Sequence, residues 1–354
     1  MNKNKRLKDE KINKICVIML GLMGDVLLRT PLVREIRRLY PSSEIVAIVD
    51  PVGQHVLQHN HTIDRLIVMN RNRNNKYQYF SNKVLVQFQL LQEHFDLVID
   101  LYGGKSTFRM MRLSNAKFQV GFKEGKKWVN QKHLQKYSDT DLRFANPHHL
   151  TNKLFQLLSF FEYYHDELDT TPEVAYTEKA YQNMQYYCKE SNIENFFLVS
   201  LGSGGMEKIL ALSKMFNLIK KIYDEYHLVP AIVKNPGQEY LQEELIQAYL
   251  MPNNIPYFKL DVLNLDELVS MMQLSKFFIV PDTGLFHLAV GAKIPILCIF
   301  THTNPLLVEP QHTTYESCFC PTSEVDLHDL PLGTSEIPDE ILFSSVEKLI
   351  KKLK

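Results

Sequence analysis

Short apolar runs alternate along the chain with longer segments of helical periodicity, and this alternation constrains the fold more than any other feature. The first run covers residues 14–20 and ends at Gly21, which is typical of a buried parallel strand. Residues 24–40 then carry apolar side chains at a period of about 3.6 residues up to Pro41, which indicates a helix. Strands and helices that alternate in this way form a parallel sheet with crossover helices on its faces.

The alternation runs through two halves of the chain. In the first half, strands are expected at 44–49, 65–69 and 96–101, and helices at 80–95 and 148–164. In the second half, strands are expected at 196–201, 228–233, 256–260, 276–280 and 294–300. Helices are expected at 212–226, from after Gly237 to about Tyr249, at 265–273, and from the 282–284 segment to Val290. We therefore predict an α/β protein with two Rossmann-like, doubly wound domains.

The length of 354 residues suits two domains of ordinary size. We expect the first domain over residues 1–165, a linker at 166–177, the second domain over 178–335 and a C-terminal helix at 336–354. Two such domains in tandem face each other across a cleft, at the carboxyl ends of the strands where these sheets bind ligands.

The overall composition excludes several classes of protein. Lys+Arg and Asp+Glu are both 40, so the formal net charge of 0 argues against a protein that coats nucleic acid. A hydrophobic content of 45% excludes disorder of the whole chain. No apolar run approaches the roughly 18 residues that cross a bilayer. No long apolar stretch follows the basic residues 1–14, so a signal peptide is not expected and we predict a cytoplasmic protein.

The charge is distributed unevenly along the chain. Residues 65–143 hold 15 Lys and Arg against 6 Asp and Glu, and residues 301–347 hold 9 acidic residues and no basic ones. Both segments can be solvated faces. Alternatively, the basic segment faces an anionic partner, and the same surface would hold the protein at an anionic membrane face without an anchor.

The five cysteines offer no convincing metal site. Cys16 and Cys298 lie inside apolar runs and are expected to be reduced core residues. Cys318 and Cys320 form the only close pair, and the second pair or the histidines of a zinc site are missing.

A first motif, Gly21-Leu22-Met23-Gly24-Asp25, lies between the first strand and the first helix. Glycines let the backbone approach a ligand, and an acid here faces the positive end of the helix dipole. Asp25 is therefore a candidate catalytic carboxylate or a simple helix cap. The pattern G-x-x-G-D differs from the G-x-G-x-x-G fingerprint, which argues against binding of NAD.

Two further motifs lie at strand ends in the second half. In Asp282-Thr283-Gly284-Leu285-Phe286-His287, backbone N–H groups and the Thr283 hydroxyl suit a diphosphate, and His287 follows Thr283 by one turn; capping and a packed histidine are the alternatives. The loop 202–205, with Lys208 after it, suits a phosphate or is a flexible turn with a solvated lysine. It is not a P-loop.

Together these motifs resemble glycosyltransferase family 9, whose best-known members are the lipopolysaccharide heptosyltransferases. The similarity covers about residues 14–315. It rests on Gly24-Asp25 and Thr30-Pro31 within 15–31, on 96–101 with Gly103, on 120–122, and on Asp282-Thr283-Gly284, His287 and Pro295 within 280–305.

The resemblance implies a GT-B fold and an inverting, metal-independent transfer of a sugar from a nucleotide diphosphate, with no cofactor. Asp25 would be the general base on the acceptor hydroxyl, and Lys208 would neutralise diphosphate charge in place of a metal. The second domain would bind the nucleotide sugar and the first domain the acceptor. The donor-binding residues implied are Gly24, Gly202, Ser203, Lys208, Gln238, Glu239, Asp282, Thr283, Gly284 and His287.

The resemblance also gives the basic excess a use. The implied donor is ADP-heptose-like, and the implied acceptor is an anionic, lipid-linked core of lipopolysaccharide or lipooligosaccharide. Candidate contacts to its carboxylates and phosphates are Arg71, Arg73, Lys105, Arg109, Arg112, Lys123, Lys126 and Lys127.

Two departures from the family pattern keep alternatives open. Ile209-Leu210-Ala211 follows Lys208, where the family usually has an aromatic residue and a proline, and either Gln238 or Glu239 takes the place of a glutamate that contacts the ribose. The alternatives are transfer of another sugar, such as a hexose, to a different surface glycan, and a non-catalytic nucleotide-sugar-binding assembly protein. A dehydrogenase is disfavoured by the missing fingerprint.

Overall fold

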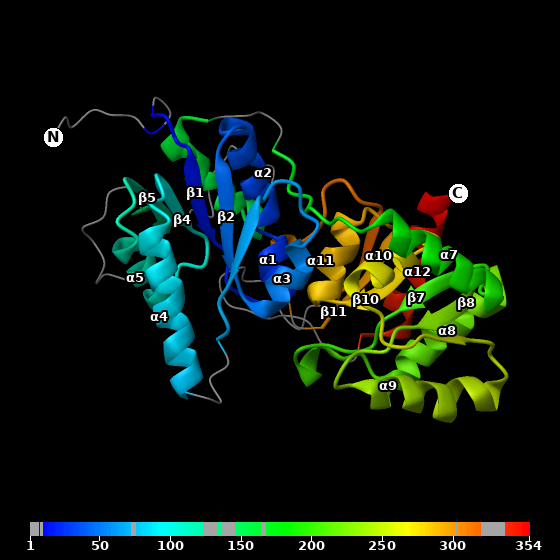
Figure 1. Cartoon of the computed structure of the whole chain (residues 1–354). Helices are drawn as coiled ribbons and strands as arrows, with labels where there is room; N and C mark the ends of the chain where they lie inside the picture. The colour runs from blue at the N-terminus through cyan, green and yellow to red at the C-terminus, as the bar shows by residue number, and fades with distance from the viewer. Residues whose placement is uncertain are drawn as a thin grey trace. The chain divides into compact units, whose positions relative to one another are not determined.

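The chain forms two compact units, residues 1–173 and 174–354, in the computed structural model shown in Figure 1. The structure describes residues 7, 10–71, 76–122, 134–135, 146–163, 168–301, 303–319 and 337–354. The division between the units falls within the segment 166–177 that we expected to be a linker.

The first unit contains a six-stranded parallel sheet with the order β3-β2-β1-β4-β5-β6. Its strands are β1 (Lys14–Ile18), β2 (Glu44–Val49), β3 (Arg65–Val68), β4 (Leu97–Asp100), β5 (Phe118–Phe122) and β6 (Leu134–Gln135). All four residues of β4 and four of the five in β1 are buried, as expected for strands covered on both faces.

The helices of the first unit are α1 (Met23–Leu27), α2 (Thr30–Leu39), α3 (Pro51–Leu57), α4 (Lys76–Gln92), α5 (Lys105–Leu113) and α6 (Leu150–Phe155), which continues as a 3₁₀ helix (Gln156–Phe161). Helices α4 and α5 cover one face of the sheet. Val86 and Leu90 of α4 and Met110 of α5 pack there against Cys16 and Ile18 of β1.

The second unit repeats this topology in a sheet with the order β12-β11-β10-β7-β8-β9. Its strands are β7 (Phe196–Val199), β8 (Val229–Ile232), β9 (Phe258–Lys259), β10 (Phe278–Pro281), β11 (Ile296–Phe300) and β12 (Tyr315–Phe319). Numbered within each unit, both sheets have the order 3-2-1-4-5-6 of a doubly wound fold. The prediction of two Rossmann-like sheets is confirmed.

The helices of the second unit are α7 (Glu178–Glu190), α8 (Leu212–Tyr226), α9 (Glu239–Glu244) with a π-helical continuation (Leu245–Leu250), α10 (Leu265–Leu274), α11 (Gly284–Gly291) and α12 (Asp339–Leu353). Leu218 of α8, Leu241 of α9 and Leu349 of α12 belong to one buried cluster with Phe197 and Ile279 of the sheet. In the part of the chain that the structure describes, no helix has the length and apolar character needed to cross a bilayer.

The single helix expected at 24–40 is wrong, because the structure divides it into α1 and α2. Pro31 has no N–H to donate and its ring clashes with a helical carbonyl four residues earlier, so the chain begins a new helix there. The Thr30 hydroxyl donates to the Leu27 carbonyl over 2.7 Å and fills the gap in the helical bonding. The helix expected at 148–164 is likewise shorter, with a 3₁₀ segment in its second half.

Candidate functional site

Each sheet has a point where the strand order reverses, between β1 and β4 in the first unit and between β7 and β10 in the second. Ligands of doubly wound proteins bind outside the carboxyl ends of the strands at this point. The motifs singled out in the sequence follow β1, β7 and β10, so the fold places them at the carboxyl ends of the central strands of the two sheets, which are called the two edges here.

The loop after β1 brings Asp25 close to Gly21. Gly21 has a φ of +148°, and a Cβ added to it would lie 2.8 Å from the Asp25 carboxylate oxygen Oδ2. That oxygen accepts a hydrogen bond from the Leu22 backbone N–H at 3.0 Å. Asp25 therefore caps α1, as the simpler interpretation of the motif proposed, and its side chain is exposed to solvent. A cap of this kind occupies one oxygen and does not bury the carboxylate.

Asp50, which follows β2, holds this loop in place through hydrogen bonds. Its Oδ2 accepts the Gly21 backbone N–H at 2.6 Å, and Arg71 donates from Nε and Nη2 to both carboxylate oxygens, each at 2.6 Å. The hydrogen bonds that Arg71 donates to Asp50 raise the pKa of Arg71. The guanidinium of Arg71, which we expected to contact an acceptor, is thus engaged within the unit by Asp50. The ring of Tyr102 also lies 5.0 Å from it.

Asp100 ends β4 and is buried at the same edge. Its Oδ1 accepts the backbone N–H groups of Tyr102 at 3.0 Å and Gly103 at 3.1 Å. Burial raises the pKa of Asp100 to about 6, although these bonds, a hydrogen bond with Thr107 and the charge of Arg29 act in the opposite direction. Arg29 donates to the Leu20 carbonyl, so the loop before Asp25 is fixed from both sides.

The other basic residues proposed for the acceptor have different positions. Lys105, Arg109 and Arg112 are exposed on α5, and their spacing of four and then three residues places them on one side of the helix. Arg73, Lys123, Lys126 and Lys127 lie outside the described residues.

In the second unit, Lys208 and Asp282 form an ion pair across the edge of the sheet. Lys208 Nζ lies 2.9 Å from Asp282 Oδ2 and 3.2 Å from the Thr303 hydroxyl oxygen. Burial would raise the pKa of Asp282, but the charges of Lys208 and His287 and the hydrogen bonds from Thr303 and Lys208 outweigh it, so the pKa lies below its usual value. Asp282 is therefore ionised at neutral pH and holds the Lys208 ammonium group at the carboxyl end of β10.

Two buried polar groups at this edge have no hydrogen-bond partner among the described residues, the Thr283 hydroxyl and the Asn304 side-chain amide nitrogen. Thr283 is the N-cap of α11 but makes no side-chain capping bond, and Asn304 is only 4% exposed. An unpaired buried donor costs about 1–3 kcal/mol, so such groups call for an explanation. A ligand that accepts hydrogen bonds at the N-terminus of α11 provides one. His287, one turn into α11, is buried and its ring packs against that of Phe286.

The glycine-rich loop after β7 is held by two side chains from the segment after β8. Asn235 Oδ1 accepts the Gly202 N–H at 3.2 Å, and Gln238 Nε2 donates to the Ser203 carbonyl at 2.9 Å. A Cβ at Gly202 would lie 2.8 Å from Asn235 Cβ, which disfavours a larger residue at this position. Glu239 instead accepts the Gly237 N–H at 3.1 Å, and backbone hydrogen bonds lower its pKa.

Sequence reasoning assigned no role to Asp50, Asp100 or Asn235, and it included Thr303 and Asn304 only as part of the motif within 280–305, without a role for either. Asp50 and Asp100 lie at the ends of strands that the sequence does predict, and a polar residue at such a position was the available signal. Cys16, Cys188, Cys298 and Cys318 are free and buried, whereas Cys320 lies outside the described residues. No group of three or more His, Cys, Asp or Glu side chains is arranged for a metal ion within the described ranges. The expectation that no metal is needed stays a prediction.

Comparison with known proteins identifies the class of enzyme. Residues 85–326 match the family described as glycosyltransferase family 9 (heptosyltransferase). The match covers more than half of the chain, and the protein is a glycosyltransferase. It belongs to glycosyltransferase family 9, as the resemblance in the sequence implied.

Individual relatives agree with this assignment. The chain is 23% identical over 314 residues to the lipopolysaccharide core heptosyltransferase OpsX of Haemophilus influenzae, covering 85% of this chain and 82% of that protein. The family 9 glycosyltransferase of Veillonella parvula has a similar structure, with a TM-score of 0.80 and 18% identity over 96% of this chain and 98% of that one. The E. coli heptosyltransferase WaaC, solved with ADP, gives a TM-score of 0.68 and 16% identity over 96% and 100%. These likenesses confirm the GT-B class of fold.

Proposed function

We propose that this enzyme transfers a heptose, or a related sugar, from an ADP-heptose-like donor to a lipopolysaccharide or lipooligosaccharide core, with inversion and without a metal ion. The names of its relatives support this choice, since OpsX is a lipopolysaccharide core heptosyltransferase and WaaC has been solved with ADP. The observation that carries the proposal is a pair of buried groups that lack a hydrogen-bond partner among the described residues: Thr283 Oγ1 at the N-terminus of α11, and Asn304 Nδ2 in the segment after β11.

In this proposal the second unit binds the donor. The N–H groups at the start of α11 and the Thr283 hydroxyl donate to the diphosphate, while Lys208, held by Asp282, supplies positive charge. Gly202, Ser203, Gly284 and His287 line the same edge of the sheet. Glu239 is the better candidate for the ribose hydroxyls, because the Gln238 amide is already engaged with the Ser203 carbonyl.

The first unit supplies the base and the acceptor contacts. The Asp25 carboxylate removes the proton from an acceptor hydroxyl, and the resulting oxygen attacks the anomeric carbon of the donor sugar. The bond from that carbon to the phosphate oxygen breaks, and its electron pair leaves with the nucleoside diphosphate, whose charge the second unit stabilises. Lys105, Arg109 and Arg112 of α5 would contact the anionic acceptor, together with Arg73, Lys123, Lys126 and Lys127.

The decisive experiment separates the two roles of Asp25, because Asn can keep the cap but cannot act as a base. We expect Asp25→Asn to lower the rate of transfer from ADP-heptose by about 10²–10⁴-fold, with little change in ADP affinity measured by calorimetry. The matched control is Glu267→Gln, since the Glu267 carboxylate accepts the N–H of Asn264, the N-cap of α10, at 2.9 Å, as Asp25 accepts the N–H of the N-cap of α1.

Transfer by Asp25→Asn at the wild-type rate would remove the catalytic assignment. If the wild type binds ADP but transfers neither a heptose nor a hexose to any core or surface-glycan acceptor, the non-catalytic binding protein becomes the better description.

A further inference from the structure

Helix α4 carries apolar side chains on two opposite sides. Val86 and Leu90 are buried in the core of the first unit. At about 100° per residue, a second apolar stripe lies on the opposite side of the helix. The stripe consists of Tyr77, Phe80, Val84, Phe88 and Leu91, which are 90%, 66%, 50%, 57% and 43% exposed.

Single exposed apolar residues are common, but a stripe of this length marks a surface that another phase or molecule covers. The stripe extends from residue 77 to residue 91 of a 17-residue helix, about 21 Å at 1.5 Å per residue. Three of its five members are aromatic: Tyr favours the boundary between water and lipid, and Phe is typical of the apolar face of helices that lie in that boundary.

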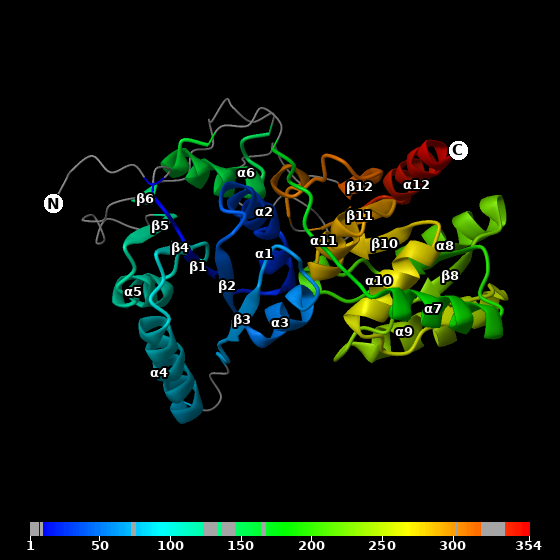
Figure 2. The ribbon, with the colours of Figure 1, turned by 45° about the horizontal axis from the view of Figure 1, so that its top comes forward.

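The charges around the stripe indicate what covers it. Helices α4 and α5 lie side by side, with Val86 and Met110 in one core cluster, and the N-terminal half of α4 extends beyond α5 (Figures 1 and 2). The two helices contain no Asp or Glu. Their basic residues are Lys76, Lys83, Lys105, Arg109 and Arg112.

We propose that the α4 stripe and the cations of α5 dock the enzyme on an anionic lipid bilayer. The apolar side chains enter the headgroup region, and Lys105, Arg109 and Arg112, which the proposed function assigns to the anionic, lipid-linked acceptor, also contact the phosphates of the surrounding lipid. A second copy of this chain is a poorer occupant, because a two-fold contact through α4 would place cationic helices beside each other with no carboxylate on either to compensate.

The proposal is tested by co-sedimentation of the full chain with lipid vesicles. We expect binding to vesicles of phosphatidylethanolamine with phosphatidylglycerol, weaker binding to vesicles of phosphatidylcholine alone, and a decline with added salt. Phe80→Gln should weaken binding by about tenfold, because a buried aromatic side chain is lost from the interface. Arg109→Gln should weaken it about fivefold, as expected for one cation near an anionic surface.

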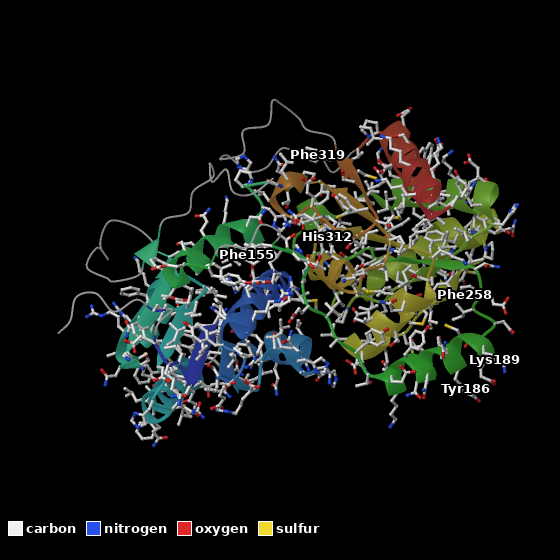
Figure 3. The ribbon with its side chains drawn as sticks, turned by 90° about the horizontal axis from the view of Figure 1, so that it is seen from above. Phe155, Tyr186, Lys189, Phe258, His312 and Phe319 are labelled. Atoms are coloured by element: carbon white, nitrogen blue, oxygen red, sulfur yellow. The ribbon has the colours of Figure 1, made fainter. Side chains whose placement is uncertain are left out.

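Helix α7 offers matched controls on the other unit. Tyr186 is also 66% exposed, and Lys189 is an exposed cation one turn later (Figure 3). Tyr186→Gln and Lys189→Gln remove the same kinds of group from a helix that also carries Glu178 and Glu190, and should leave vesicle binding unchanged. All four variants should unfold at the wild-type temperature, since each altered side chain is exposed.

Three results would overturn the proposal. The wild type could fail to bind phosphatidylglycerol vesicles, or Phe80→Gln and Arg109→Gln could bind no more weakly than their α7 controls. Alternatively, light scattering could show a lipid-free dimer that Phe80→Gln dissociates, which would assign the stripe to a subunit contact. Vesicle binding does not require transfer, so Asp25→Asn should bind normally, and failure of this proposal is distinguishable from failure of the proposed function.

Discussion

The contact between Asp50 and Arg71 gives a quantitative test of how firmly the loop before Asp25 is held. The side chains of Asp50 and Arg71 are 13% and 24% exposed, and their paired hydrogen bonds measure 2.6 Å. Removing one partner of a buried pair costs about 3–5 kcal/mol, and the partial exposure of Arg71 reduces this. We expect Asp50→Ala to cost about 3 kcal/mol, since it also leaves the Gly21 N–H without its acceptor.

The double-mutant cycle isolates the pair itself. Arg71→Ala should cost about 2 kcal/mol, and the double variant about 3 kcal/mol, so the coupling energy is about 2 kcal/mol. The control cycle is Lys220 with Asp224 on α8, an i,i+4 pair about half exposed on both sides, for which less than about 0.5 kcal/mol is expected.

The assay is urea denaturation, monitored by hydrogen–deuterium exchange of peptides from β1 and β2. These peptides report the unfolding of the first unit separately from that of the second. Asp50→Ala should also lower the melting temperature of that unit by about 6–12 °C. A coupling energy no larger than that of the α8 pair would refute the reasoning, because the contact would then behave as an ordinary surface ion pair.

Three other predictions follow from the same geometry. Thr283→Val should raise the unfolding temperature of the free protein by about 2 °C or more, since it removes a buried hydroxyl that has no partner among the described residues, but should weaken ADP binding about fivefold in calorimetry; unchanged affinity would remove Thr283 from the donor site. Burial raises the pKa of Asp100 to about 6, so between about pH 4 and pH 6 the folded protein holds more protons than the unfolded protein, and its free energy of unfolding falls as the pH rises. In urea titrations Asp100→Asn should lack this decline, which is about 3 kcal/mol for the wild type. An identical pH profile for the variant and the wild type would contradict this prediction. Transfer activity should persist in EDTA, because Lys208 and the start of α11 supply the positive charge; a loss that a divalent ion restores would show that a metal is needed.

Much of the fold could be predicted because buried strands and amphipathic helices leave strong local patterns. Helix α8 has the bounds that its apolar period predicts, residues 212–226, and β7 lies within the run at 196–201. The break between α1 and α2 was missed because the apolar period continues across it, and only the Thr30-Pro31 pair signals it. Strand β12, Tyr315–Phe319, has a mixed polar sequence and becomes a strand by pairing with β11.

The site was predictable only where its residues are close in sequence. The segments around Asp25 and Thr283 carry their glycines and polar groups within a few positions. The contacts of Asp50 with Gly21 and of Lys208 with Asp282 span 29 and 74 residues, so they depend on which strands become neighbours. Gly21 and Asp50 meet because β1 pairs with β2, and Lys208 and Asp282 meet because β7 pairs with β10 where the strand order reverses; no local pattern encodes either pairing.

Lys208, Asp282 and Thr303 form a hydrogen-bonded network within the second unit. Asp50, Gly21 and Arg71 form another within the first unit. A mutation that changes the hydrogen bonds of one network therefore leaves those of the other network unchanged. Under the proposed function, in which the second unit binds the donor and the first the acceptor, a lineage of the family can change one preference while inheriting the other half unaltered, and exchanging halves between relatives is a route to new pairs of substrates.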